Sequence, residues 1–142
     1  MYNLYFDIAA TTPIDKNVAE LMTEIQNNIF GNPSSIHQFG QKSKSVIEKS
    51  RRQISKSLNC SPNEIIFTSG GSESNNLVLH GALNKGDHLI TSSYEHPAIT
   101  KVAKKLEQKG VEVSYLKPNP SGIIDHNDVK NAIKDNTVLI SI

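Results

Sequence analysis

The sequence has a single cysteine, no tryptophan and no long hydrophobic run. Cys60 alone excludes a disulfide within the chain, and it fits a reducing compartment. No apolar run approaches the roughly 20 residues that a membrane-spanning helix needs. The start, Met1–Asp7, lacks the basic and apolar regions of a secretory signal. We therefore expect a cytoplasmic protein that does not enter a membrane.

The sequence also has no large excess of positive or negative charge. The sequence has 15 Lys and Arg against 14 Asp and Glu, so a net charge of +1 gives no overall attraction to nucleic acid or membranes. The stretch 39–58 is locally basic, with six cationic residues against Glu48. No aromatic residues interleave with these cations to stack on bases. A solvated helix face is therefore favoured over a nucleic-acid patch.

Several common motifs are missing. The sequence contains no G-x-x-x-x-G-K followed by Ser or Thr, and no G-x-G-x-x-G, so neither nucleotide fingerprint is present. Its five histidines and Cys60 show no paired short spacing, so no metal site is predicted. The order of residues supports no Ser-His-Asp triad either.

Residues 1–60 read as an N-terminal segment with two helices. Asp15 can cap a helix that runs toward Ile29, and glycine and proline in 31–35 end it. A second helix is predicted over about 39–58. Its expected inward side chains are apolar: Phe39, Val46, Ile47, Ile54 and Leu58.

In residues 61–142 the hydrophobic pattern differs from that of residues 1–60, and the change follows a capping box at Ser61–Glu64. Strand-like runs alternate with helix-like runs. The predicted strands are 64–68, 88–92, 111–116 and 137–142, and the predicted helices end near 84, 108 and 134. This alternation predicts an α/β fold with a mostly parallel sheet and right-handed crossovers. Ile142 lies inside a β-branched run, so we expect the chain to stop within a domain.

The stretch Thr68–Asn76 is the first candidate site. It contains Gly70, Gly71 and Ser72 between a predicted strand and a predicted helix. Glycines let an anion approach the backbone, and the first N–H groups of a helix are unpaired and point at it. A phosphate site is one interpretation, and an ordinary capped turn is the other.

The second candidate is His96, which follows the predicted strand 88–92. Ligands of open parallel sheets gather at the carboxyl ends of the strands, so His96 and the glycine-rich loop should share one edge. A phosphate site beside an imidazole suits a ligand with a phosphate and an aromatic ring. Alternatively, His96 is a helix cap or a surface residue.

Four motifs in order carry a family resemblance: 6–13, 31–37, 67–76 and 95–98. They closely resemble the cysteine desulfurases of the NifS/IscS type. These enzymes belong to the class-V aminotransferases and use pyridoxal 5'-phosphate (PLP). The resemblance implies a fold-type-I three-layer α/β sandwich. Residues 61–142 would supply the first part of its PLP-binding large domain, truncated at the C-terminus.

The resemblance also implies roles for individual residues. Gly70, Gly71 and Ser72 match positions that hold the cofactor phosphate, and His96 matches the catalytic histidine that stacks on the pyridine ring. Other positions match segments that line the substrate entrance: Ala10, Thr11, Asn32 and His37. His37 could equally be a structural loop residue.

The sequence departs from the family pattern in places. Gly71 and Ser72 stand where many members have alanine and threonine, but a hydroxyl is kept. The cofactor-binding lysine of the family follows a Ser-His pair, and none of the five histidines here precedes a lysine. Cys60 does not match the catalytic cysteine. We therefore expect this chain to be inactive by itself.

The activity implied for the full enzyme is conversion of L-cysteine to L-alanine. The sulfur would pass to a protein cysteine as a persulfide, for iron-sulfur cluster or thio-cofactor synthesis. Sulfur-acceptor or scaffold proteins and a homodimer are implied, without nucleic acid or membrane. Two alternatives stay open: a selenocysteine lyase or other class-V aminotransferase, and a non-catalytic remnant or partner-binding fragment.

Overall fold

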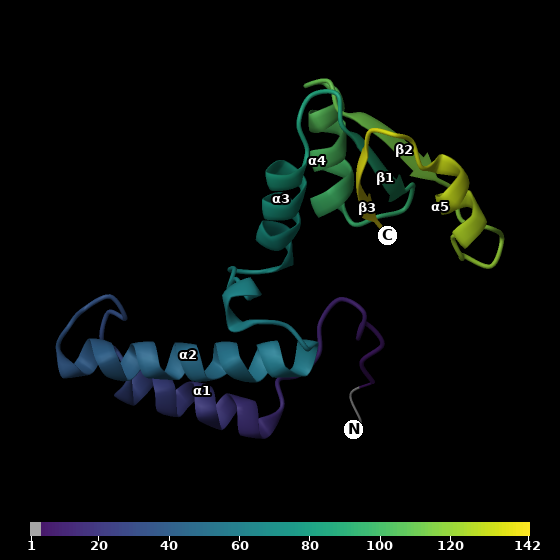
Figure 1. Cartoon of the computed structure of the whole chain (residues 1–142). Coiled ribbons are helices and arrows are strands. Elements are labelled where there is room, and N and C mark those ends of the chain that lie inside the picture. The colour runs from purple at the N-terminus through teal and green to yellow at the C-terminus, as the bar shows by residue number, and fades with distance from the viewer. Residues whose placement is uncertain (1–3) are drawn as a thin grey trace. The chain divides into compact units, whose positions relative to one another are not determined.

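A computed structural model describes residues 4–142 of the chain (Figure 1). The chain forms two compact units, the first ending at Ile66 and the second spanning Phe67–Ile142. The sequence placed the change of organisation after residue 60. Among residues 4–142, no helix combines the length and the apolar character that a membrane crossing requires.

The first unit contains α1 (Lys16–Asn28), α2 (Gln38–Leu58) and the 3-10 turn η1 (Pro62–Glu64). The predicted cap of α1 is confirmed, because the Asp15 carboxylate accepts the N–H groups of Asn17 at 2.9 Å and Val18 at 3.4 Å. In the predicted capping box, Glu64 accepts the N–H of Ser61 at 2.6 Å.

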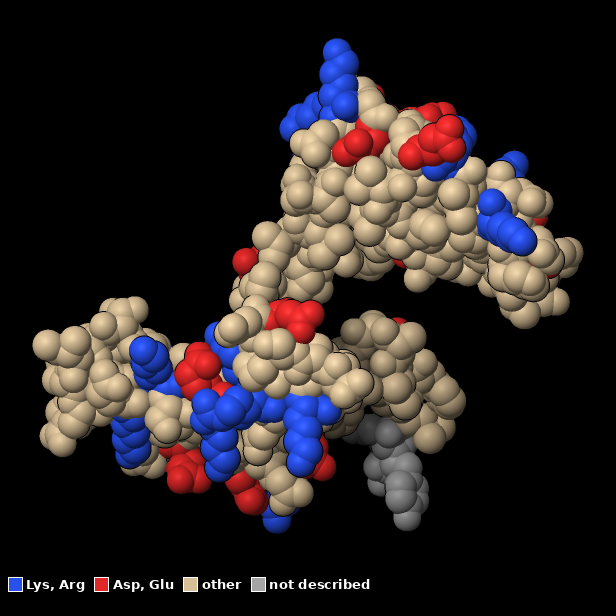
Figure 2. Space-filling view, viewed as in Figure 1, with Lys and Arg blue, Asp and Glu red and all other residues tan. Residues whose placement is uncertain are grey.

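The predicted inward face of α2 is only partly correct. Val46 and Ile47 are half-buried, but the side chains of Phe39 and Leu58 are 48% and 66% exposed, and Ile54 is exposed too. The buried positions of α2 are small: Gly40, Ser43 and Ser55. Within residues 4–66, α1 and the short turn η1 are the elements that can lie against α2, and they are too few to cover its whole apolar stripe. Figure 2 shows Lys and Arg side chains gathered on the visible surface of this unit.

The second unit confirms the alternation of strands and helices. Its elements are α3 (Gly71–Ala82), β1 (His88–Ser92), α4 (Pro97–Glu107), β2 (Glu112–Leu116), α5 (His126–Ala132) and β3 (Thr137–Ser141). The sheet is entirely parallel with strand order β2-β1-β3. Successive right-handed crossovers in opposite directions place α4 and α5 on opposite faces of the sheet, as Figure 1 shows.

The predicted strand 64–68 was wrong. Residues 62–64 form η1, and residues 65–68 join none of the strands in the described part of the chain. The backbone of Ile65 is extended, with φ −91° and ψ 123°. An extended segment becomes a strand only when a neighbouring strand pairs with its N–H and C=O groups. The loop before α3 is therefore preceded by a segment outside the sheet instead of by a strand.

The core of the second unit lies between one face of the sheet and the pair α3 and α4. It consists of buried aliphatic side chains: Leu79, Leu83, Leu89, Ile99, Val102, Ala103, Leu106 and Val111. Every residue of β1 is buried, because this strand is central in the sheet.

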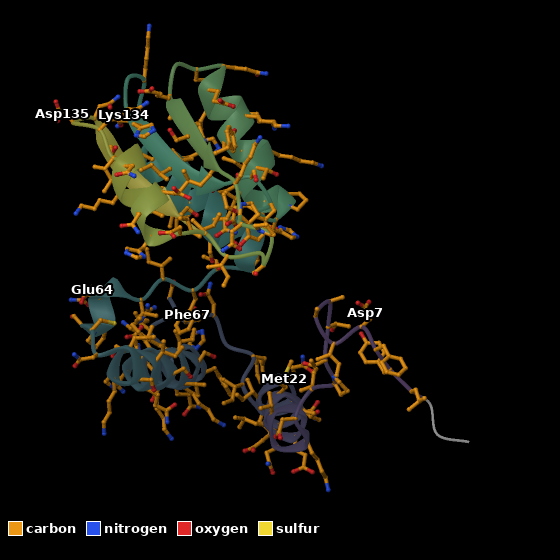
Figure 3. All side chains as sticks on the ribbon, turned by 90° about the vertical axis from the view of Figure 1, so that its right-hand side faces the viewer. Asp7, Met22, Glu64, Phe67, Lys134 and Asp135 are labelled. Carbon is orange, nitrogen blue, oxygen red and sulfur yellow. The ribbon has the colours of Figure 1, made fainter. Side chains whose placement is uncertain are left out.

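His88 is a buried polar residue at the start of β1. Its Nδ1 lies 2.8 Å from the Thr137 hydroxyl of β3, and its Nε2 lies 2.9 Å from the Ser114 hydroxyl of β2. The side chain thus joins all three strands. Burial, with Lys134 nearby, lowers the pKa of His88, and Glu112 opposes this shift. Figure 3 shows Lys134 at the end of the sheet where the strands begin.

Candidate cofactor site

One edge of the second unit gathers the two loops singled out in the sequence. β1 and β3 end at this edge, and α3 and α4 begin there (Figure 1). The chain leaves β1 toward β2 on one side, and β3 lies on the other side, so the strand order reverses at β1. Ligands of open parallel sheets bind outside the carboxyl ends of the strands at such a reversal.

The glycine-rich loop forms the N-terminus of α3. The first backbone hydrogen bond of this helix runs from the Ser74 N–H to the Gly70 carbonyl, at 3.1 Å. The N–H groups of Gly71, Ser72 and Glu73 therefore precede the helix's own hydrogen-bond ladder. Together with the helix dipole, they form a site that favours an anion.

The hydroxyl groups around this turn are mostly engaged within the protein. The hydroxyls of Thr68 and Ser74 lie 2.7 Å apart, and the Ser69 hydroxyl donates to Glu73 at 2.6 Å. The Ser72 hydroxyl makes no hydrogen bond to any residue in 4–142, and only its carbonyl is used, by Asn76. Ser72 therefore keeps its hydroxyl for a ligand.

The space in front of the loop is open. A Cβ atom added to Gly70 or Gly71 would meet no other atom within 4 Å. The backbone of Gly70 is extended, with φ 163°, which any residue can adopt. Glycine is thus not required by the backbone here, and it leaves the N–H groups accessible to a ligand.

Glu73 is a residue of this site that the sequence analysis missed. Its carboxylate accepts the Ser69 N–H at 2.7 Å and the Ser69 hydroxyl at 2.6 Å, and these bonds lower the pKa of Glu73. The carboxylate thereby ties the loop to the first turn of α3. The sequence did contain a signal for Glu73: it is an acidic residue in the first turn of a predicted helix, four residues after a serine.

His96 is the N-cap of α4. Its Nδ1 accepts the N–H of Ala98 at 3.1 Å, which confirms the interpretation of His96 as a helix cap. Because Nδ1 uses its lone pair in this bond, the neutral ring carries its proton on Nε2. The side chain is exposed. Capping thus fixes the ring through Nδ1 and leaves the Nε2–H free to donate.

Asn32 and His37 lie together in the first unit, before and at the start of α2. The Asn32 side chain accepts the N–H of Ser34 at 2.9 Å, and His37 caps α2 by accepting the N–H of Gly40 at 3.4 Å. A Cβ atom on Gly40 would lie 2.5 Å from the Asn32 carbonyl oxygen. The loop therefore packs directly on the backbone of α2, and His37 has a structural role.

Ala10 and Thr11 lie in a separate exposed turn of the first unit. Their N–H groups donate to the Asp7 carbonyl at 3.1 and 3.3 Å, and the Tyr5 hydroxyl donates to the carbonyls of Asp7 and Thr11. The four predicted entrance residues thus belong to the first unit. Gly70, Gly71, Ser72 and His96 belong to the second.

The donors at the second unit's edge fit the phosphate of PLP. Free N–H groups, one free hydroxyl and open space are what a phosphate requires. An exposed, capped imidazole at the same edge provides an aromatic face. Within 4–142, no three His, Cys, Asp or Glu side chains gather into a metal-binding group.

Comparisons with known proteins find relatives over nearly the whole chain. A family model described as "Aminotransferase class-V" matches residues 4–142. The cysteine desulfurase IscS of Colwellia psychrerythraea is 46% identical over 98% of this chain. The match covers 36% of that relative, so the chain spans about a third of the relative's length.

Solved structures give the same result. A structure described as "SspA in complex with cysteine" has a TM-score of 0.84 and 42% identity, and the match covers 96% of this chain and 40% of that one. A "NIFS-LIKE PROTEIN" has a TM-score of 0.87 and 32% identity over 94% of this chain and 38% of its own. The α/β architecture with a parallel sheet is thus shared with proteins of this group.

Proposed function

Because this chain belongs to the class-V aminotransferase family, we propose that it supplies the cofactor-phosphate site of a PLP-dependent cysteine desulfurase. The relatives that it matches are about three times as long. The proposed activity of the full protein is conversion of L-cysteine to L-alanine, with transfer of the sulfur to a protein cysteine as a persulfide.

The first turn of α3 is the observation that carries this proposal. The N–H groups of Gly71 and Ser72 and the Ser72 hydroxyl would hold the phosphate, aided by the helix dipole. The neighbouring hydroxyls are engaged with one another, and Glu73 holds Ser69. The loop is therefore preorganised, so binding costs little ordering of the chain.

His96 would hold the aromatic ring. Its Nδ1 is engaged by the N–H of Ala98, so the ring offers one face and an Nε2–H group. That group can donate a hydrogen bond or exchange a proton with the substrate. When bound, PLP supplies the electron sink for reactions of the amino acid.

We assign no covalent anchor for PLP and no persulfide-forming cysteine within this chain. No histidine is followed by lysine here, and Cys60 lies just before η1 in the first unit. We therefore propose that the chain alone binds PLP reversibly and does not turn over L-cysteine. The loops at Ala10, Thr11, Asn32 and His37 would contribute to the substrate entrance.

The proposal extends to the setting of the full enzyme. A homodimer that works in the cytoplasm with sulfur-acceptor or scaffold proteins is what membership of the desulfurase group supports. Iron-sulfur cluster or thio-cofactor synthesis would consume the transferred sulfur.

The test is a titration of the 142-residue chain with PLP, followed by absorbance, beside a titration with pyridoxal, which lacks the phosphate. We expect PLP to bind reversibly and inorganic phosphate to displace it. Equal affinities for PLP and pyridoxal would show that the α3 site is not used. A borohydride-stable adduct on one specific lysine would refute the absence of a covalent anchor.

A further inference from the structure

The segment that carries His96 is held to the sheet at its start. The N–H of Ser93 donates to the Leu116 carbonyl at 2.8 Å, which extends the pairing of β1 with β2. The hydroxyl of Ser92, which is fully buried, donates to the Glu95 carboxylate at 2.7 Å. These two bonds fix the backbone as it leaves β1, but they do not reach its outer part.

Tyr94 holds the outer part of this segment. Its hydroxyl donates to the Gly122 carbonyl at 3.1 Å, across 28 residues of sequence. The side chain is 57% exposed, so packing alone does not fix it. Between segment 93–96 and turn 119–123, this is the one side-chain hydrogen bond in the described part of the chain.

The turn that accepts this bond is held together by hydrogen bonds of its own. The Asn119 side chain accepts the N–H groups of Ser121 and Ile123, each at 3.0 Å, and the Asn119 N–H donates to the Ile123 carbonyl at 2.9 Å. Gly122 has φ 80°, a conformation that favours glycine. The Gly122 carbonyl therefore has a defined position and can serve as a fixed anchor.

We propose that Tyr94 is a positioning residue for His96, acting as a strut between turn 119–123 and the segment before α4. The role of His96 toward PLP rests on the proposed function, but the strut itself does not. The Ala98 N–H fixes the His96 ring from the α4 side. Tyr94, two residues earlier, fixes it from the loop side, so the ring orientation is set from both directions.

Tyr94→Phe tests the strut, because it removes the hydroxyl and keeps the ring. Tyr115→Phe is the matched control, since it removes a hydroxyl that donates to Glu107 at 2.9 Å in the same unit. The readouts are the imidazole ¹⁵N spectrum of His96 and hydrogen exchange of the Ala98 amide, neither of which needs a ligand. For Tyr94→Phe we expect exchange at Ala98 to quicken about 2- to 10-fold, as loss of one hydrogen bond does. The His96 ring should also move away from a single tautomer.

Asn119→Ala adds a second, independent test. It loosens the turn that holds the Gly122 carbonyl, so it should affect His96 as Tyr94→Phe does. The double variant should then change Ala98 exchange no more than Asn119→Ala alone, because both changes break the same strut. Fully additive effects would contradict the proposal.

The outcomes separate the strut from the cofactor proposal. If Tyr94→Phe leaves the His96 and Ala98 signals as unchanged as Tyr115→Phe does, the strut is refuted whether or not PLP binds. If those signals change and the wild-type chain fails to bind PLP, the strut stands and the cofactor proposal falls. Where both hold, Tyr94→Phe should weaken PLP binding about 2- to 10-fold and leave inorganic phosphate binding unchanged.

Discussion

Ser72 differs from its neighbours because its hydroxyl has no partner among residues 4–142. We predict that Ser72→Ala weakens PLP binding about 10- to 100-fold, the effect of one hydrogen bond to a charged group, without abolishing it. The backbone N–H groups of α3 remain and continue to bind the phosphate. Absorbance titration measures the change.

Ser57→Ala is the matched control for this prediction. The Ser57 hydroxyl is exposed and donates only to the Gln53 carbonyl, at 3.1 Å, within α2. This variant should bind PLP like the wild type. Equal affinities of Ser72→Ala and Ser57→Ala would remove Ser72 from the phosphate site.

At the level of residues, the sequence predicted which positions carry chemistry but not how each is engaged. Gly70 to Ser72 and His96 stood out by composition and by their place after extended segments. That Ser72 has the free hydroxyl depends on the pairing of Thr68 with Ser74. These side-chain contacts depend on loop geometry, which residue types alone do not determine.

Gly40 shows how one element depends on another. A Cβ atom at this position would lie 2.4 Å from the Ser35 carbonyl oxygen, within a contact that real Cβ atoms do not make. We predict that Gly40→Ala lowers the free energy of unfolding of the first unit by about 1–3 kcal/mol, the usual cost of overpacking. Urea unfolding, followed by NMR signals from each unit, measures the effect.

Gly81→Ala is the matched control in α3. A Cβ atom there meets nothing within 4 Å, and alanine favours a helix by up to about 1 kcal/mol over glycine. This variant should be neutral or slightly more stable. A Gly40→Ala variant as stable as Gly81→Ala would mean that the loop at 31–35 does not pack on α2.

His88 links protonation to the stability of the sheet. Its pKa is lowered in the folded state, mainly by burial, so the unfolded chain takes up the proton first. The stabilisation from neutral His88 is therefore complete above the unfolded pKa of about 6.5 and is lost as the pH falls toward the folded pKa. We predict that His88→Gln removes this pH dependence and lowers stability at pH 8 by about 1–3 kcal/mol.

The measurement is urea unfolding of the second unit between pH 8 and pH 5. Lys134 and Glu112 face His88, so both residues are kept in each variant. His126→Gln serves as the control, because the His126 side chain is 90% exposed. If His88→Gln retains the wild-type slope with pH, another group is responsible for it.

At the level of elements, the predictions that rest on local signals were correct, and the errors lie in two features that depend on what packs against them. Helical segments with caps, such as α1 after Asp15 and η1 with its capping box at Ser61–Glu64, were predicted because the signal lies within a few residues. The predicted strand at 64–68 was wrong, and the predicted inward face of α2 was only partly correct. Both depend on what packs against them, which short sequence windows do not contain.

The second unit leaves part of its sheet uncovered. Val138 and Ile140 on β3 are 51% and 44% exposed, and in the described residues β3 has a neighbour on one side only. An unpaired edge with apolar residues promotes association between chains. We predict that Val138→Lys reduces concentration-dependent association of the 142-residue chain, measured by light scattering.

Val78→Lys is the control for this prediction. Val78 lies on α3 and is 52% exposed, so the change in charge and in apolar area is matched while the sheet is untouched. Association that falls equally in both variants would point to net charge as its cause instead of the β3 edge.

His88 has a further consequence for the molecule as a whole. Its two ring nitrogens are both hydrogen-bonded only when β2 and β3 are in place. The partners are Ser114 and Thr137, which lie 26 and 49 residues farther along the chain. A one-residue slip of either strand leaves a buried nitrogen without its hydrogen bond. The His88 imidazole therefore couples the register of β2 to the register of β3. Its full stabilisation of the sheet is present only when both strands pair correctly with β1.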